Sequence, residues 1–188
     1  MKTLDLLPIG DVDGRLLKTL APALAGSFRV PCRILDRRLD PQFAFHPERG
    51  QYHSSELLQI MQSYAADGAW RVLGVTSVDL YIPILTFVFG EAQMGGPCAV
   101  VSFHRLAEQF YGLPHDPDVL MERLVKEAVH EVGHTFDLTH CDDYSCAMAP
   151  SHAVEWIDLK ERTLCSSCQS LVFASFEWAQ RERLLPLL

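Results

Sequence analysis

The sequence predicts an α+β fold made of one domain, residues 1–188, in which packed helices and strands are followed by a smaller C-terminal subdomain. Three observations predict it. The first part of the chain alternates between β-rich runs and helical apolar patterns. A long amphipathic pattern then starts at Pro117 and carries two histidines four residues apart. Beyond His140 the chain changes to four cysteines and few apolar runs. We therefore place a subdomain boundary there, giving an N-terminal subdomain, 1–140, and a C-terminal subdomain, 141–188.

The N-terminal subdomain begins with a predicted strand, helix and strand. Residues 3–9 and 28–35 are short apolar runs that are typical of buried strands. Between them, Asp13 is placed to cap a helix whose leucines repeat at helical spacing and which Gly26 should end. Pro22 lies inside that stretch and disfavours the helix. A strand, a helix and a strand in this order predict a parallel pair of strands with a right-handed crossover.

A surface loop, a second helix and three more strands are expected before the central helix. Residues 36–50 combine charged residues with prolines and a glycine, as exposed loops do. Ser54 or Ser55 can cap the second helix, whose buried side would extend to Tyr64. Strands are predicted at 70–76, 85–90 and 98–106, with a turn or exposed loop at 90–97.

The central helix carries the residues with the clearest chemistry. Asp116 is a good N-cap, and Pro117 suits the first helical position. His130 and His134 lie one turn apart on the same helix face, so both imidazoles could reach one zinc ion. Glu131 could then lie beside the metal-bound water as a general base.

His140 extends this pattern. It follows His134 by six residues, so the helix must end between them if His140 is to turn back as a third ligand. Three protein ligands leave a fourth position open for water, which is typical of a catalytic zinc site. The alternative is an amphipathic helix that carries two histidines by chance, and the third histidine disfavours it.

Four cysteines in the C-terminal subdomain predict a second metal site. Cys141 and Cys146 are separated by four residues and Cys165 and Cys168 by two, with eighteen residues between the pairs. This spacing fits a closed tetrahedral thiolate zinc site with a structural role. Two disulfides or free thiols are the alternative. The two remaining cysteines and two isolated histidines receive no metal role: Cys32, Cys98, His46 and His53.

The composition and charge of the chain disfavour several classes of partner and location. The net charge is −8, which disfavours nucleic-acid and anionic-lipid partners. No apolar run is long enough to span a bilayer. Residues 1–8 resemble a first strand and not a signal peptide. We therefore expect a cytoplasmic monomer, in which cysteines are thiols or metal ligands.

These motifs together resemble a known family. The His-Glu-x-x-His helix with a third histidine is similar to the metzincins. The cysteine directly after that histidine, the step Cys146-Ala147-Met148 and the later Cys165-x-x-Cys168 resemble the archaemetzincins, over residues 130–168. The resemblance implies a metzincin-like zincin fold with a mixed twisted sheet and a catalytic helix. It implies a catalytic zinc on His130, His134 and His140, with Glu131 as general base and acid. It also implies that Met148 is the Met-turn residue beneath that zinc.

The chain departs from the family pattern at two positions. Metzincins usually have glycine at the position of Asp137, where the helix ends and the backbone adopts a left-handed conformation. Aspartate is among the few other residues that adopt it, so the turn can form. Asp137 could also accept a hydrogen bond from a ligand histidine. Some metzincins have a tyrosine two residues after the Met-turn methionine, where this chain has Pro150.

Two functions follow as hypotheses. The first is a zinc-dependent metallopeptidase with two zinc ions, one catalytic and one structural, that acts on a peptide or protein substrate. An edge strand near residues 98–106 could hold the substrate by strand pairing. The second is a zinc-stabilised peptide-binding protein with little or no hydrolysis, which the aspartate at position 137 suggests.

Overall fold

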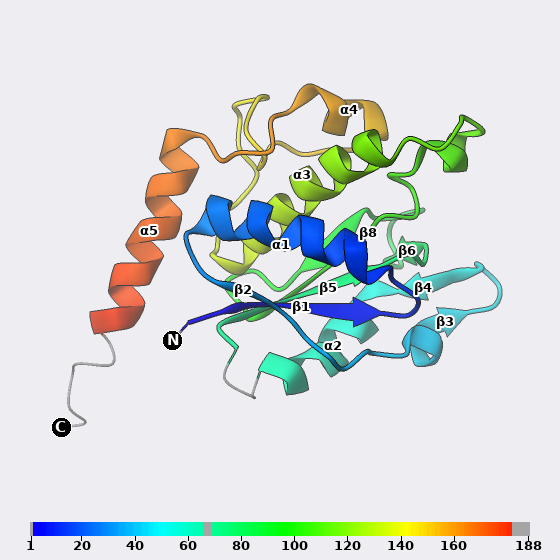
Figure 1. Ribbon diagram of the computed structural model, residues 1–188, viewed down its shortest axis with the longest axis horizontal. Helices are drawn as coiled ribbons and strands as arrows, with labels where there is room; N and C mark the ends of the chain where they lie inside the picture. Colours follow the sequence, from blue (N-terminus) through cyan, green and yellow to red (C-terminus); the bar gives the residue numbers. More distant parts are fainter. Residues whose placement is uncertain (1, 66–68, 182–188) are drawn as a thin grey trace.

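The central feature of the molecule is a five-stranded sheet with helices on both faces (Figure 1). The computed structural model describes residues 2–65 and 69–181. The strand order is β2-β1-β5-β8-β7. All neighbours pair in parallel except β7, which runs antiparallel to β8 at the edge. The strands are β1 (Leu4–Ile9), β2 (Cys32–Ile34), β5 (Arg71–Thr76), β7 (Gly90–Ala92) and β8 (Cys98–Ser102).

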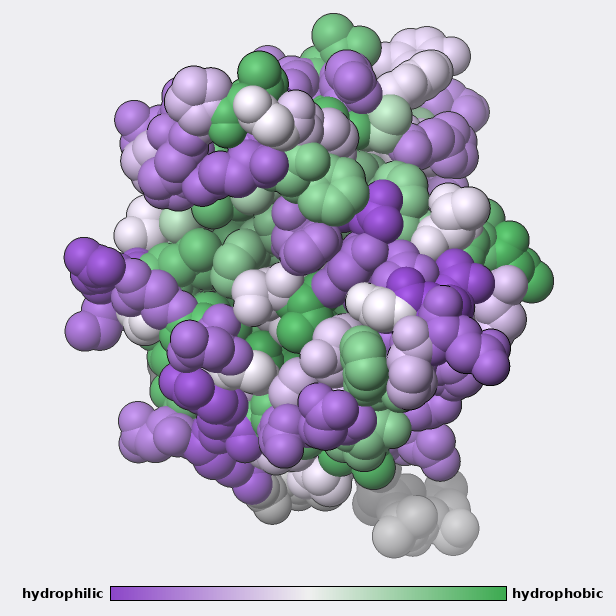
Figure 2. Space-filling view, turned by 90° about the vertical axis from the view of Figure 1, so that its right-hand side faces the viewer, coloured by the Kyte–Doolittle hydropathy of each residue, from purple (hydrophilic) through white to green (hydrophobic). Residues whose placement is uncertain are grey.

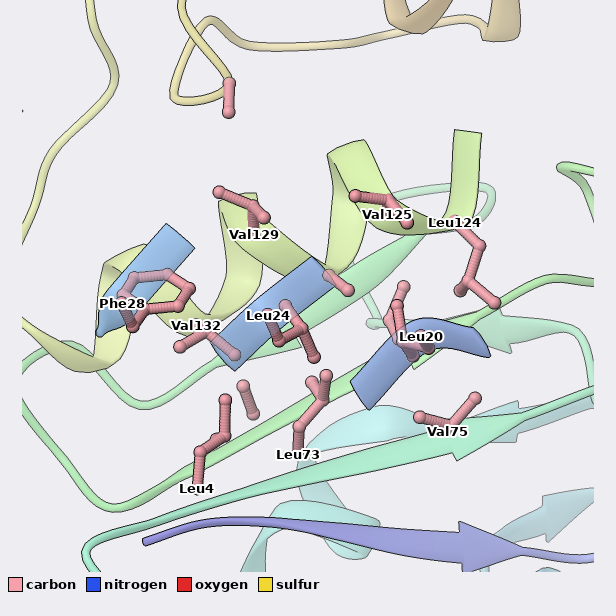
Figure 3. Packing of buried hydrophobic residues seen from close by; sticks show 14 of the residues in the cluster. Leu4, Leu20, Leu24, Phe28, Leu73, Val75, Leu124, Val125, Val129 and Val132 are labelled. Atoms are coloured by element: carbon pink, nitrogen blue, oxygen red, sulfur yellow. The ribbon is translucent and has the colours of Figure 1, made fainter. Parts of the chain in front are cut away.

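Helices α1 (Gly14–Phe28) and α3 (Pro117–Thr135) cover one face of the sheet, and α2 (Ser54–Ala65) covers the other. Alternate residues of each strand serve the two faces, because side chains of a strand point alternately to opposite sides. In β1, Leu4 and Leu6 belong to the core under α1 and α3, whereas Leu7 and Ile9 belong to the core over α2. Figure 3 shows the first of these cores, with Leu4, Leu73 and Val75 facing the helices. These layers confirm the predicted α+β fold.

The order of the first predicted unit is confirmed, but two boundaries are wrong: the helix is longer than expected, and the second strand covers only Cys32–Ile34 of the predicted residues 28–35. Strands β1 and β2 pair in parallel, and the Asp13 carboxylate accepts a hydrogen bond from the Arg15 backbone N–H at the start of α1. The helix does not end at Gly26 but continues to Phe28. Phe28 is fully buried in the core, and Arg29 adopts the left-handed conformation that ends the helix, with φ 52°. The helix therefore continues past Gly26, which alone predicted its end, because the longer helix buries Phe28 in the core.

The prediction of a strand at 85–90 is wrong. Within this stretch Val88 makes only an isolated bridge to Leu80, and the edge strand β7 begins at Gly90, where a loop was expected. The Arg49 side chain explains part of the difference. Its guanidinium donates to the carbonyl oxygens of Leu85 (2.9 Å) and Thr86 (3.0 Å), so these acceptors are occupied by a side chain and not by a neighbouring strand.

Small elements that the sequence did not indicate lie around the main sheet. A second sheet has the order β3-β4-β6. It consists of β3 (Phe45–His46), β4 (Gln51–His53) and β6 (Leu80–Tyr81), and two 3-10 turns cover Pro41–Ala44 and Glu108–Tyr111. Strand β8 ends at Ser102, short of the predicted 106, because residues 103–106 form a turn closed by the Leu106 N–H and the Phe103 carbonyl.

The C-terminal subdomain packs on α3 and α1. It holds α4 (Val154–Leu159), which was not predicted, and α5 (Ser166–Arg181), which begins before the predicted Leu171. Residues 182 and 183 of the predicted last helix lie outside the described residues. Val154, Ile157 and Val172 belong to the same buried cluster as α1 and α3. One apolar core therefore spans both sides of the proposed boundary at His140.

The molecular surface in Figure 2 shows hydrophilic and hydrophobic residues interspersed over the face seen there. Among the described residues, no helix is both long and apolar enough to cross a membrane.

Candidate metal centres

Helix α3 places two histidines side by side, as their spacing predicts. The Nε2 atoms of His130 and His134 lie 3.1 Å apart, and His130 is buried. The long N-terminal part of the helix is fixed by Asp116, whose side chain accepts hydrogen bonds from the backbone N–H groups of Asp118 and Val119. The core side of the helix packs on the sheet through residues such as Leu124 and Val132 (Figure 3). Both imidazoles therefore project from a rigid, well-anchored element.

At the end of α3, Asp137 has the left-handed backbone conformation expected where metzincins usually have glycine. Asp137 adopts a left-handed conformation with φ 66°. The Asp137 N–H donates to the His134 carbonyl at 2.9 Å, and the Leu138 N–H donates to the Gly133 carbonyl at 3.3 Å. These two bonds form a complete Schellman motif, in which a left-handed residue just beyond the helix ends it. The chain can therefore turn back toward the helix, as the third histidine requires.

His140 joins the two helical histidines after this turn. Its ring centroid lies 5.3 Å from that of His130 and 5.2 Å from that of His134. One ring nitrogen from each of the three residues lies within 4.8 Å of the others, so the group could hold a metal ion. His130 is buried, His134 is half-buried and His140 is exposed, so the group is open to solvent on one side.

The outer nitrogens of the helical imidazoles are fixed by backbone carbonyls. The Nδ1–H of His130 donates to the Ala147 carbonyl at 2.9 Å, and the Nδ1–H of His134 donates to the Leu138 carbonyl at 2.7 Å. With each proton held on Nδ1, both Nε2 atoms present lone pairs to each other. Asp137 is therefore not the acceptor for a ligand histidine, and the backbone carbonyl of the next residue has that role.

Two facing lone pairs repel each other unless a cation lies between them. The donor set of three imidazoles fits zinc, for which imidazole nitrogen is a common ligand. Burial lowers the pKa of all three histidines, and the change is large for His130. The neutral imidazole, which is the form that binds metal, is therefore favoured.

Glu131 lies deep beside these histidines. It is only 6% exposed, and its side chain packs directly against strand β7. A Cβ atom at Gly90 would come within 2.6 Å of the Glu131 Cγ, so glycine is required there for the carboxylate to occupy this place. Burial raises the pKa of Glu131 well above its ordinary value; Glu127 adds to this effect and Lys160 opposes it. The carboxyl group thus holds a proton more readily than an exposed glutamate does.

A cavity of about 580 Å³ opens over the three histidines and Glu131. It is lined by the segment 85–92 with Met94, which is mostly apolar, and by the segment 150–152. The acidic side chains Glu91 and Glu127 also line it. This is a concave site in which a few polar groups converge on an apolar lining, as ligand sites commonly are.

Met148 lies beneath the histidines, where the resemblance places the Met-turn. It is fully buried, and a Cβ atom at Gly133 would come within 2.4 Å of the Met148 sulfur. The methionine therefore fits against the bare backbone of α3 between Glu131 and His134. Because Ala147 precedes it and accepts the bond from His130, the same turn also orients that imidazole.

A buried ion pair ties α3 to the segment after Met148. Lys160 Nζ lies 2.8 Å from Glu127 Oε1, with side chains 1% and 4% exposed, and Lys160 also donates to the Ala149 carbonyl at 3.2 Å. Glu127 is one turn before Glu131, so its spacing could have marked it as a member of the same face. No feature of the sequence around Lys160 predicts its position.

The four cysteines converge as their spacing predicts. One sulfur from each of Cys141, Cys146, Cys165 and Cys168 lies within 4.8 Å of the others, and the Cys141 and Cys165 sulfurs are 3.9 Å apart. All four thiols are free, so the predicted alternative of disulfides does not apply to this structure. Four thiolates in this arrangement fit a closed tetrahedral zinc site.

Backbone N–H groups point at these sulfurs. Cys146 Sγ accepts from the Met148 N–H at 3.4 Å and the Cys165 N–H at 3.2 Å. The Cys168 backbone N–H lowers the pKa of the Cys165 thiol, whereas burial raises the pKa of Cys146 and Cys168. A cation would offset the burial that disfavours thiolates at Cys146 and Cys168, which is a second reason to place a metal there.

The two clusters share the chain between His140 and Met148. Cys141 directly follows His140, and the Cys141 N–H donates to the Met148 carbonyl at 3.0 Å. Cys146 precedes Ala147, the acceptor for His130. The cysteine cluster therefore fixes the loop that supports the histidine cluster.

Comparison with known proteins gives a consistent result. The model of Peptidase family M54 matches residues 17–173. An archaemetzincin of Methanocaldococcus jannaschii is 40% identical over 161 residues, which cover 86% of this chain and 87% of the relative.

Two solved structures resemble the whole fold. The archaemetzincin of Methanopyrus kandleri matches with a TM-score of 0.80 and 34% identity, covering 94% of this chain and 96% of the other. A zinc-dependent peptidase of Methanocorpusculum labreanum matches with a TM-score of 0.80 and 29% identity, covering 90% and 99%. These matches confirm the fold that the motif resemblance implied.

Proposed function

This chain belongs to the archaemetzincins, peptidase family M54 of zinc metallopeptidases, and from that premise we propose that it hydrolyses peptide bonds at the three-histidine cluster with Glu131 as general base. One observation carries the proposal. Glu131 directly follows His130 and lies about one turn before His134 on α3, and all three line one open cavity together with His140. A site that only stabilised the fold would need neither this carboxylate nor an open side.

We assign the catalytic zinc to His130, His134 and His140. The carbonyls of Ala147 and Leu138 support this assignment, because they leave both helical Nε2 atoms free of protons. When bound, zinc would polarise the scissile carbonyl and lower the pKa of the attacking water.

Glu131 moves the proton. As a carboxylate it accepts a proton from the attacking water, and it later passes that proton to the nitrogen of the leaving amine. Its raised pKa supports this second step, because a carboxyl group buried against Gly90 and α3 holds the proton between the two steps.

The substrate peptide pairs with β7 and not with β8. The sequence suggested an edge near residues 98–106, but β8 lies between β5 and β7, so its backbone groups are occupied. The residues that flank β7 bond to β8: the Phe89 carbonyl accepts from the Ser102 N–H, and the Gln93 N–H donates to the Cys98 carbonyl. Alternation along the strand turns the backbone groups of Gly90 and Ala92 to the free edge, beside Glu131. An extended peptide could form a new strand there.

The four-cysteine cluster holds a second zinc with a structural role. Its support is the closed set of four sulfurs and their backbone N–H donors. Met148 packs beneath the catalytic cluster as the Met-turn residue and binds no metal. Peptides, and not nucleic acids or lipids, are the proposed partners, in keeping with the net charge of −8.

A non-hydrolytic, zinc-stabilised peptide-binding protein is the alternative that Asp137 suggested. The experiment that separates the two compares zinc-loaded wild type with Glu131→Gln on a mixed peptide library, with zinc content measured for both. Hydrolysis requires cleavage by wild type and a loss of roughly 100-fold or more in the variant, at equal zinc content. If both proteins bind peptides and neither cleaves them, the peptide-binding function replaces the peptidase.

A further inference from the structure

The cavity must stabilise a negative oxygen if the proposed hydrolysis takes place there. As water adds to the scissile carbonyl, its oxygen gains charge, and a hydrogen-bond donor aimed at it strengthens during the reaction. The family position at which some metzincins carry a tyrosine is Pro150, whose side chain has no donor. This chain must therefore either lack such a donor or supply it from another residue.

Few residues of the cavity can supply it. Among the described lining residues outside the three ligand histidines, only Thr86, Ser151 and His152 carry a side-chain O–H or N–H other than a carboxyl group. Lys160 is not a candidate, because it lies behind Glu127 and is engaged by that carboxylate and by the Ala149 carbonyl.

The position of His152 favours it over the other two. The Ser151 hydroxyl oxygen is closed off from solvent and has no partner among the described residues, so it could not meet a substrate without movement. Thr86 lies in the segment 85–92, apart from the segment 150–152, and its backbone carbonyl is held by Arg49. His152 is exposed and lines the same cavity as the three histidines. Its segment also begins beside His140, because the Met148 carbonyl accepts a hydrogen bond from the N–H of Cys141 at 3.0 Å.

The segment that carries His152 is anchored at both ends. Before it, the Ala149 carbonyl is held by Lys160; after it, Val154 begins α4 and is buried in the core. The His152 ring also contacts the Trp156 ring edge-on, with centroids 6.4 Å apart. A side chain on such a segment can stay near the ligand histidines while remaining accessible from the cavity.

We propose that His152 is a further catalytic residue of this chain, whose imidazole N–H donates a hydrogen bond to the scissile carbonyl oxygen as that oxygen becomes negative. This role rests on the proposed peptidase function. The imidazole transfers no proton and forms no covalent bond. It adds a donor from the segment 150–152, whereas the proposed peptide-binding strand is β7.

The test compares two inhibitors on the zinc-loaded full chain by titration calorimetry. A phosphinic peptide has a tetrahedral centre that carries a negative oxygen, so it resembles the transition state. A peptide hydroxamate also binds zinc but has no tetrahedral centre. In His152→Leu we expect the phosphinic peptide to bind about 10–100-fold more weakly and the hydroxamate to change by less than about twofold. His152→Gln keeps an N–H donor and should recover part of the loss.

Matched variants make the result specific. His115→Leu removes an exposed imidazole outside the cavity and should change neither affinity. Thr86→Val and Ser151→Ala test the competing donors, and a selective loss of the phosphinic peptide in either variant would overturn the assignment to His152. Unchanged binding in His152→Leu, equal weakening of both inhibitors, or no binding of the phosphinic peptide to wild type would overturn it as well.

Turnover gives a second readout. With a library peptide that wild type cleaves, His152→Leu should lower kcat by a similar factor and leave KM within about twofold, because the bond strengthens only in the transition state. If wild type cleaves no peptide, the proposed function fails. The comparison of inhibitors still decides whether His152 recognises a tetrahedral anion.

Discussion

Asp137 is the single residue at which the chain departs from the usual glycine of the turn, and the structure shows how it is accommodated. Its φ of 66° lies in the left-handed region, and the helix-ending hydrogen bonds around it are complete. Its side chain is exposed and makes no hydrogen bond among the residues that the structure describes. The carboxylate is therefore a tolerated substitute for glycine and not a support for a ligand.

We accordingly expect Asp137→Gly to change the free energy of unfolding by less than about 1 kcal/mol, with stability equal or raised. Glycine avoids the steric cost of the left-handed conformation but gains freedom in the unfolded chain, so the two effects partly cancel. Thermal melts and zinc content of the variant measure this. Asp137→Val is the control that should lose stability, since a β-branched residue strongly disfavours positive φ. A large loss in the glycine variant would assign the carboxylate a structural role.

Unlike position 137, which accepts a side chain, position 133 requires glycine because Met148 leaves no room for a Cβ atom. Gly133→Ala would place a Cβ atom 2.4 Å from the Met148 sulfur, and we expect overpacking to cost about 1–3 kcal/mol and to lower zinc retention at the histidines. Gly26→Ala is the matched control within α1, where no atom lies within 4 Å of the new Cβ. That change should raise stability by about 0.5–1 kcal/mol. Urea melts of both variants give the comparison, and equal stability of the two would contradict the packing argument.

The buried histidines also predict how stability depends on pH once metal has been removed. The pKa of each ligand histidine is lowered from the ordinary value of 6.5, so the folded chain binds fewer protons than the unfolded chain below that pH. Their contribution is present above about pH 6.5 and lost as the pH falls. Glu131 has the opposite sign, because its raised pKa lets the folded chain take up a proton above 4.5.

Melting temperatures of the chelated protein should therefore fall between about pH 7 and pH 5. The fall should be steeper in Glu131→Gln, which deletes the opposing group. A melting temperature that rises over this range, or an unchanged slope in the variant, would contradict the assigned directions.

At the scale of elements, the sequence predicted best where one local pattern determines the structure. Asp13 and Asp116 mark the starts of α1 and α3 because a capping side chain needs only its own backbone neighbours. The spacing of His130 and His134 places both on one face for the same local reason. A helix end between His134 and His140 was predictable, because His140 could join the two helical histidines only if the chain turned between them. The family resemblance placed that end at Asp137.

Prediction failed where partners distant in sequence decide the structure. Residues 85–90 look like a strand, but Arg49 binds the carbonyls of Leu85 and Thr86 from another part of the chain. The ion pair of Glu127 with Lys160 joins residues that the sequence gives no reason to pair. The edge position of β7 also depends on the order of the whole sheet, which short patterns do not contain.

The Glu127–Lys160 pair links α3 to the Met-turn segment, and its removal tests that link. We expect Lys160→Met to cost about 3–5 kcal/mol, because the Glu127 carboxylate would remain buried without its partner. The double variant Lys160→Met with Glu127→Leu should recover most of the loss. Arg15→Met is the control, since its pair with Asp13 is 88% and 51% exposed and should change stability little. Denaturant unfolding of these variants measures it, and a double variant as unstable as the single one would contradict the pairing argument.

At the scale of the whole molecule, the two candidate metal clusters differ in how they are built into the fold. The cysteine cluster joins the loop after His140 to the start of α5, whereas the histidine cluster has an open side and rests on an intact helix. Metal binding to the closed cluster is part of the folding free energy. The boundary at His140 stays a prediction, and the apolar core continues across it.

We therefore expect Cys165→Ser to lower the melting temperature more than His140→Ala does. In His140→Ala two helical imidazoles and the whole core remain, so the fold should persist with a weakened catalytic site. Thermal melts together with metal analysis of both variants provide the measurement. A melting temperature of Cys165→Ser close to wild type would remove the structural role from the cysteine cluster.

The loop from His140 to Met148 has a consequence for how the chain takes up its metals. Since Cys141 and Cys146 hold the same loop that positions His140 and the Ala147 carbonyl, an ion in one cluster prepares the other. Linkage is reciprocal, so each ion must raise the affinity of the other cluster by the same factor. A chain that already holds an ion in the cysteine cluster would then bind zinc at the histidine cluster more tightly than an empty chain. Peptidase activity would respond to zinc supply more steeply than a single independent site allows.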